Sequence, residues 1–178
     1  MQNKNGSLVK GQIGRMLLLI GCSGIFGMAI SAQTPAGTIP KADPRVAKAL
    51  KETNTEFDLS SKDGMYKVTY GTKGKRVQTT HVASATEDIN GVEMRLIFSF
   101  STILKALPSH ETANLLLQDN MERIGRWAVQ KLDDGSWAIL SLIYIPASSG
   151  GKQLEAALMT IATQADEMEE QLTKKDVN

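Results

Sequence analysis

Apolar and polar residues alternate most regularly between Val92 and Phe100. Val92, Met94, Leu96, Phe98 and Phe100 alternate with Glu93, Arg95 and Ser99. A period of two places successive side chains on opposite faces of a strand. We therefore predict a strand whose apolar side faces the core and whose other side faces water.

A second apolar stretch lies between Leu115 and Pro146. It predicts the end of a helix, a strand that begins at Gly125, a tight turn at Asp134-Gly135 and a strand from Trp137 to Ile145. This last strand is apolar on both faces, so one face packs in the core and the other needs a cover. A helix, a second subunit or a bound peptide could supply it.

Shorter strands are predicted before this block. Residues 57–60 and 65–70 are joined by a turn at Asp63-Gly64, and Asn90-Gly91 forms a later hairpin turn. The strand over 76–84 is polar on one side, which favours an edge or a solvated face. Trp127 and Trp137 flank the Asp134-Gly135 turn, and we interpret them as core residues, with a binding platform as the alternative.

Helix signals separate these strands. Asp43 before Pro44 is an N-cap signal, and Ser109 can cap a second helix that has Glu111 in its first turn. A final helix carries one continuous apolar stripe, with an acidic face that we expect to be solvated. The stripe consists of Leu154, Leu158, Ile161, Ala165, Met168 and Leu172, and the acidic face of Asp166, Glu167, Glu169 and Glu170.

The predicted fold class is α+β, an antiparallel sheet packed against helices in the order α-β-β-β-β-α-β-β-α. The 178 residues, 42% of them hydrophobic, can bury one core, so one domain is expected over residues 43–173. The 20 Lys and Arg residues nearly balance 19 Asp and Glu residues, which gives no overall field that would recruit nucleic acid.

Residues 1–32 have the layout of an export signal. Basic residues precede an apolar run from Met16 to Ile30, and small residues end at Ala32, the candidate cleavage site. The alternative is a lipobox that ends in Cys22, whose lipid would retain the protein at a membrane. We therefore expect a periplasmic or secreted bacterial protein, or one anchored to the envelope by lipid. Residues 33–42 are predicted to be a flexible linker and 174–178 a disordered tail.

Several features together resemble the YbjN family of bacterial domains, whose fold is similar to that of type III secretion chaperones. They are Leu115-Leu116 followed by Asn120, Ile124-Gly125 followed by Trp127, the Asp134-Gly135 hairpin, and the helix from Leu154 to Leu172 with Ala165-Asp166 and Glu169 near its end. The resemblance covers about residues 43–172. It implies a chaperone-like α+β fold, often dimeric, with a surface that can hold a peptide, and it carries over no catalytic residues.

No stretch matches a catalytic or cofactor motif. Residues 148–152 before the last helix lack the glycine spacing and the hydroxyl residue of a phosphate loop, so we interpret them as a connector. His81 and His110 have no partner at metal-ligand spacing, and Asp133 and Asp134 suit a turn. We therefore predict no cofactor, no metal and no catalytic residue.

The sequence favours a binding domain that captures a protein or peptide partner or forms a homodimer. The predicted surface is hydrophobic and consists of Met94, Leu96, Phe98, Leu140, Leu142 and Tyr144. Contact with a membrane is expected only through the signal segment or a lipid at Cys22. The alternative is an envelope enzyme or a small-ligand-binding protein, for which a deep pocket lined by His81, Arg95 or Glu93 would be the sign.

Overall fold

The structure is a computed structural model that describes residues 41–173. The predicted export signal with its cleavage site at Ala32, the alternative lipidation site Cys22, the linker up to residue 40 and the tail 174–178 lie outside the described residues.

The described chain alternates between helices and strands. In chain order the elements are α1 (Pro44–Glu52), β1 (Asp58–Leu59), β2 (Tyr66–Gly71), the short 3₁₀ helix η1 (Lys73–Lys75), β3 (Val77–Ile89), β4 (Val92–Leu104), α2 (His110–Asp119), β5 (Arg126–Lys131), β6 (Trp137–Pro146) and α3 (Gly151–Thr173). This order confirms the predicted α+β class and the predicted succession of helices and strands.

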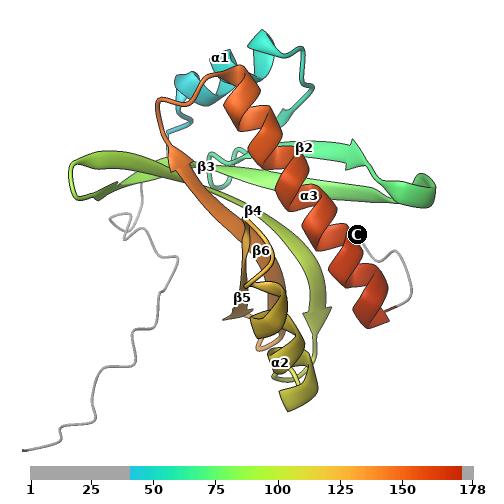
Figure 1. Cartoon of the computed structure of the whole chain (residues 1–178). Helices are drawn as coiled ribbons and strands as arrows, with labels where there is room; N and C mark the ends of the chain where they lie inside the picture. Colours follow the sequence, from blue (N-terminus) through green and yellow to red (C-terminus); the bar gives the residue numbers. More distant parts are fainter. Residues whose placement is uncertain (1–40, 174–178) are drawn as a thin grey trace, which may run out of the picture. The chain divides into compact units, whose positions relative to one another are not determined.

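The strands form one antiparallel sheet in the order β1-β2-β3-β4-β6-β5 (Figure 1). β3 and β4 make a long hairpin around Asn90 and Gly91, which both have positive φ, as a tight primed turn requires. The β6 strand pairs with β4 along nearly its whole length and brings β5 to the far edge.

The helices of the described chain pack on one face of the sheet, which we call the helix face. α3 crosses this face and contacts β2, β3, β4 and β6, and α1 packs against α3 (Figure 1). In the core beneath them, Val68, Val82 and Ile97 from the sheet meet Leu158 and Ile161 from α3. Leu116 of α2 joins a smaller cluster on the same face with Trp127, Ile139 and Met168.

Two predictions about the strands are wrong. β3 is an interior strand, and Gln78 and Thr80, on the side predicted to lie at an edge or in solvent, are 1% and 0% exposed. In β4, Arg95 and Ser99 were predicted to face water, but they are 2% and 0% exposed because the helices cover their side, and Arg95 pairs with Asp43 at the start of α1. A polar pattern in a strand therefore marked a covered face here.

The apolar stripe of the last helix is confirmed, but its acidic face is not solvated throughout. Leu154, Leu158, Ile161, Ala165 and Met168 are buried. Asp166 and Glu169, predicted to face solvent, are 3% and 0% exposed.

The start of α3 lies against α1 so closely that only glycine fits. A Cβ atom added at Gly151 would lie 2.5 Å from the carbonyl oxygen of Ala49 and 2.8 Å from Cβ of Glu52. Neither atom can move without shifting α1. The neighbouring Gly150 has room, since its nearest atom would be 3.8 Å away.

Replacing Gly151 with alanine should lower the free energy of unfolding by about 1–3 kcal/mol, because the added methyl group forces α1 and α3 apart. Chemical denaturation of the variant and the wild type measures the difference. Gly150→Ala is the matched control and should change stability by less than about 0.5 kcal/mol. Equal effects of the two substitutions would contradict the close contact between α1 and α3.

Candidate functional site

The six residues of the predicted surface lie together on the face of the sheet opposite the helices, which we call the far face. β4 and β6 pair so that Leu96 lies beside Tyr144 and Phe98 beside Leu142, while Met94 is beside Pro146 and Leu140 beside Phe100. Each strand contributes every second residue, so these side chains share one face. The sequence therefore identified a true spatial cluster.

The cluster on the far face is built from strands and the residues that flank them. Its buried members are Ala83, Leu96, Phe98, Ala138 and Leu140, and around them pack Met65, Phe100, Ala128, Leu132, Leu142 and Tyr144. Leu96, Phe98 and Leu140 are 6%, 8% and 0% exposed, so these three predicted surface residues are core. Met94, Leu142 and Tyr144 are half-buried, as is Phe100. The accessible residues of the predicted surface are thus Met94, Leu142 and Tyr144, and Phe100, which was not predicted, lies beside them.

One row of residues crosses the far face from strand to strand. Lys67, His81, Phe98, Leu142 and Arg126 are successive register partners on β2, β3, β4, β6 and β5. Beyond Lys67 the row continues to Asp58 on β1. Asp58, Lys67 and Arg126 are exposed, and Phe98 lies near the middle of the row. An apolar centre with a charged rim is the usual anatomy of a protein interface.

His81 lies among aromatic rings on this face. Its ring stacks on Phe98 with centroids 4.9 Å apart and meets the edge of Phe100 at 5.7 Å. Its buried Nδ1 atom has no hydrogen-bond partner within the described structure. Burial lowers the pKa of His81 to about 4, with a smaller contribution from Lys67, while Asp63 opposes the shift. The imidazole is therefore neutral near pH 7.

The polar residues that would have indicated a catalytic pocket do not meet. Arg95 lies on the helix face, where it pairs with Asp43 and donates to the carbonyls of Ala83 and Ser84. Glu93 accepts hydrogen bonds from both terminal nitrogens of Arg45, and these bonds lower the pKa of Glu93 to about 2. His81 is on the opposite face. Arg95 and Glu93 thus anchor the start of α1.

Four hollows of the described structure do not bring these three residues together. Three hollows of about 460, 430 and 380 Å³ are lined without His81, Arg95 or Glu93. Arg95 lines the fourth, a void of about 10 Å³, which has room for about one water molecule.

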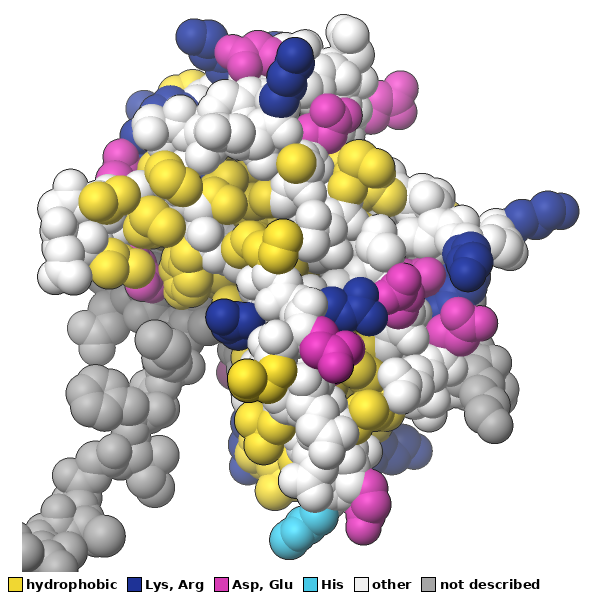
Figure 2. Space-filling view, viewed as in Figure 1, with side chains coloured by type: hydrophobic (Ala, Val, Ile, Leu, Met, Phe, Trp, Pro, Cys, Tyr) yellow, Lys and Arg dark blue, Asp and Glu magenta, His cyan; other side chains and the backbone are white. Residues whose placement is uncertain are grey.

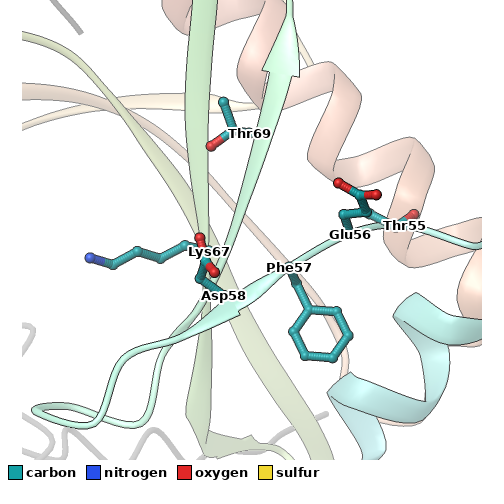
Figure 3. A pocket seen from close by; sticks show the side chains of 6 residues that line it. All are labelled: Thr55, Glu56, Phe57, Asp58, Lys67 and Thr69. Atoms are coloured by element: carbon teal, nitrogen blue, oxygen red, sulfur yellow. The ribbon is translucent and has the colours of Figure 1, made fainter.

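The largest of these hollows lies beside β1 and β2 (Figure 3). It is lined by Thr55, Glu56, Phe57, Asp58, Lys67 and Thr69. Figure 3 shows that Phe57 points toward α1, Lys67 points the opposite way and Glu56 points toward α3. The charged groups therefore do not converge on one point, as the groups of an acid-base site must.

The first backbone amide of α3, that of Gly151, is not available to bind an anion. The backbone N–H of Gly151 donates to Oε2 of Glu52 at 2.9 Å, so a carboxylate of the chain itself occupies the position that a phosphate would take. In the turn, Asp134 accepts the backbone N–H of Ser136 at 2.9 Å, as turn chemistry predicts.

The two tryptophans lie in different surroundings. Trp127 is buried and donates its indole N–H to Asp119 at 2.7 Å, which fits the predicted core role. Trp137 is half-buried, with Nζ of Lys131 5.8 Å from the ring centroid. Their register partners are Ser141 and Lys131, so they do not face each other across the hairpin.

His110 is exposed at the first residue of α2. In the part of the chain that the structure describes, no three His, Cys, Asp or Glu side chains are grouped so that they could hold a metal ion. Between residues 41 and 173, no helix has both the length and the apolar character needed to cross a membrane.

Exposed hydrophobic side chains also gather around α2, away from the predicted surface. Leu107, Leu117, Met121 and Ile124 are 64%, 64%, 87% and 76% exposed. Figure 2 shows hydrophobic side chains below α1 and again near α2, at the end of the molecule that also carries a histidine.

Sequence reasoning missed a layer of buried polar groups between α3 and the sheet. The hydroxyl oxygens of Thr80 and Ser141 on the sheet have no hydrogen-bond partner in the described structure. The side-chain amide oxygen and nitrogen of Gln164 on α3 also have none. A buried polar group without a partner costs about 1–3 kcal/mol. The polar pattern of β3 was the available signal, but it was interpreted as solvent exposure.

Two arginines from separate loops hold α3 over this polar layer. Arg76 donates from Nε to Asp166 at 2.8 Å and lies 3.9 Å from Glu169, and Arg123 donates to Glu167 at 2.7 Å. The side chain of Arg76 is only 14% exposed, so its pairs are screened little by water. This is where the acidic residues of α3 find their partners.

Replacing Arg76 with alanine should destabilise the fold by about 3–5 kcal/mol, because Asp166 and Glu169 then remain buried without their cation. Thermal and chemical unfolding measure the loss. Lys73→Ala, which removes an exposed cation from the same hairpin, is the control and should have little effect. A loss for Arg76→Ala no larger than that of the control would show that the buried carboxylates do not depend on this pair.

The stability of the protein should fall as the pH drops from about 6.5 to about 4. In this pH window His81 takes up a proton in the unfolded chain but not in the folded chain, so protonation favours unfolding. Across the window the free energy of unfolding should fall by on the order of 2–3 kcal/mol. Denaturation at a series of pH values should show that His81→Phe flattens this slope. His110→Gln should keep it, and a slope that survives in His81→Phe would disprove the assignment.

Comparisons with known proteins leave the family open. No protein-family model, curated protein or solved structure matches this chain. The resemblance to the YbjN family therefore stays a prediction from the residues named above.

Proposed function

We propose that the protein is a binding domain that acts without catalysis and captures a segment of a partner protein on the far face of its sheet. The observation that carries this proposal is the apolar cluster of that face, which is built from strands and the residues beside them and leaves Met94, Phe100, Leu142 and Tyr144 half-buried. Hydrophobic surface rimmed by polar residues is typical of sites that bind another protein.

The rim of the far face supports the same function. The row that contains Phe98 and Leu142 ends in Arg126 on one side and in Lys67 and Asp58 on the other, so this apolar strip is bounded by charged residues on both sides. A partner segment would bury apolar anchors against Leu142 and Tyr144 and place polar groups near these cations. A second copy of the chain could use the same strip, which would make a homodimer.

The proposal includes an extracytoplasmic location. The layout of residues 1–32 supports export to the periplasm or the exterior, and a lipid on Cys22 is the alternative form. Mass spectrometry of the N-terminus of the mature protein separates a chain that begins after Ala32 from one that begins at a lipidated Cys22.

A photo-crosslinking amino acid at position 142 tests the proposed surface. In cells that export the protein, it should form adducts with one defined partner or with a second copy, because Leu142 lies in the accessible part of the strip. The matched control is the same amino acid at Leu117, which is 64% exposed on α2 and should give no such adduct.

The variant Leu142→Thr completes this test. It should lose the adducts formed from a crosslinker at Tyr144, while light scattering of residues 33–178 shows whether a dimer is lost as well. Crosslinks that are equally strong from positions 142 and 117, or a folded Leu142→Thr variant with unchanged adducts and unchanged mass, would show that the strip is only core.

A further inference from the structure

The second strand of the sheet is longer than the edge strand that covers it. β1 pairs with β2 only at Leu59 with Tyr66 and at Asp58 with Lys67. β2 continues through Val68–Gly71, all of which pair with β3 on the inner side. On the outer side of these four residues, the described chain has no further strand. At about 3.3 Å per residue, this open edge is about 13 Å long.

Two of the hollows described above lie along this edge. The first, of about 460 Å³, is lined by Lys67 and Thr69 of β2 and by residues 55–58. The second, of about 430 Å³, is lined by Tyr70 to Lys73 and by α3 from Met159 to Glu170. Together they border β2 from Lys67 to its end and beyond. The space beside the strand is therefore not filled by side chains.

Figure 3 shows why the first hollow is open. The chain lies away from β2 at Thr55 and Glu56 and reaches it only at Asp58, so the hollow remains open beside Thr69. Phe57 contacts Tyr66, with ring centroids 5.5 Å apart, instead of lying over the strand edge. The backbone of β2 is thus approachable from the side.

The opposite edge of the sheet is less suited to receive a strand. The backbone N–H of Trp127 in β5 already donates to Oδ1 of Asn120 at 2.6 Å. Arg126, Gln130 and Lys131 place polar and charged side chains along β5, a common device against edge pairing. β2 is therefore the edge that a new strand would choose.

Side chains beside the open edge indicate the chemistry of the added strand. Glu56 and Asp58 line the first hollow against Lys67, and Asp166, Glu167 and Glu170 line the second against Lys73. In the second group, Asp166 and Glu170 pair with Arg76, and Glu167 pairs with Arg123. Glu56 is exposed and forms no ion pair in the described structure. Acidic side chains therefore prevail at the first hollow, so a basic segment fits the edge best.

We infer that the outer edge of β2, Val68–Gly71, is a strand-addition site for an extended, basic segment of a partner protein. The backbone of the segment hydrogen-bonds to β2 and continues the sheet beyond the end of β1. Its side chains on one side lie in the hollow beneath α3, near Met159, and those on the other side lie beside Thr69. This site uses a strand edge and does not depend on the far face.

Amide hydrogen exchange followed by NMR tests the site with a synthetic peptide of alternating lysine and valine as the probe. The peptide should slow exchange severalfold at the amides of Val68–Gly71 that point outward, which in an antiparallel strand are those of alternate residues, because added backbone hydrogen bonds protect edge amides. The same peptide with an N-methyl group on every residue is the control and should give no protection, since it has no backbone donor on either edge. Absence of protection at saturating peptide, or equal protection by both peptides, would overturn the inference.

Charge reversal separates this site from other surfaces. Glu56→Lys should weaken binding of the lysine-valine peptide about two- to fivefold, the range of an exposed ion pair. Glu122→Lys makes the same charge change beside α2 and should leave the affinity unchanged. Equal weakening in both variants, or protection that appears in Arg126–Lys131 instead, would place the peptide elsewhere and refute the edge site.

Discussion

A six-stranded sheet has two faces to cover, and within residues 41–173 the helices pack on only one of them. α1, α2 and α3 meet the sheet through Leu50, Leu116 and Leu158, all buried on the helix face. The far face must therefore bury its apolar residues with strand residues and the residues that flank them, such as Met65 and Leu132. Leu140 at 0% exposure shows how far this succeeds, and the half-buried Leu142 and Tyr144 show where it stops. The location of accessible apolar surface follows from this one-sided cover.

The helix face combines apolar packing with buried charge. Arg95 pairs with Asp43, and Arg76 pairs with Asp166. The hydrogen bond from Arg45, the interactions with Arg95 and the backbone N–H of Arg45 hold the pKa of Asp43 well below its ordinary value, against the opposing effect of burial. Because a charge buried without a partner is costly, each of these pairs also fixes a position: Asp43 sets the start of α1, and Asp166 sets α3 against the β2–β3 hairpin. These charged residues therefore have a structural role that does not depend on any reaction.

The two proposed surfaces rely on different physics. The far face offers apolar side chains, so recognition there depends on which anchors a partner brings, and a single polar substitution can remove it. The edge of β2 offers backbone groups, so recognition there depends on an extended partner and is tuned by the acidic side chains around it. Lys67 borders both surfaces: it belongs to the row across the far face and also lines the hollow at the edge. One partner could therefore contact both.

Local patterns in the sequence determined the elements of this protein. The capping signals at Asp43 and Ser109, the Asn90-Gly91 turn and the spacing of leucines in α3 all act over a few residues, and the structure has each of them. The period-two pattern of β4 and β6 also grouped the residues of the far face, because alternation alone decides which side chains share a face.

Only the tertiary structure decided which face the helices cover. Thr80, Arg95 and Ser99 looked solvated because their burial depends on helices that lie far away in the sequence, α3 and, for Arg95, also the start of α1. The sequence also did not predict the open edge of β2. This edge exists because β1 pairs with β2 at only two residues and the chain before β1 lies away from β2, and no local pattern encodes this arrangement.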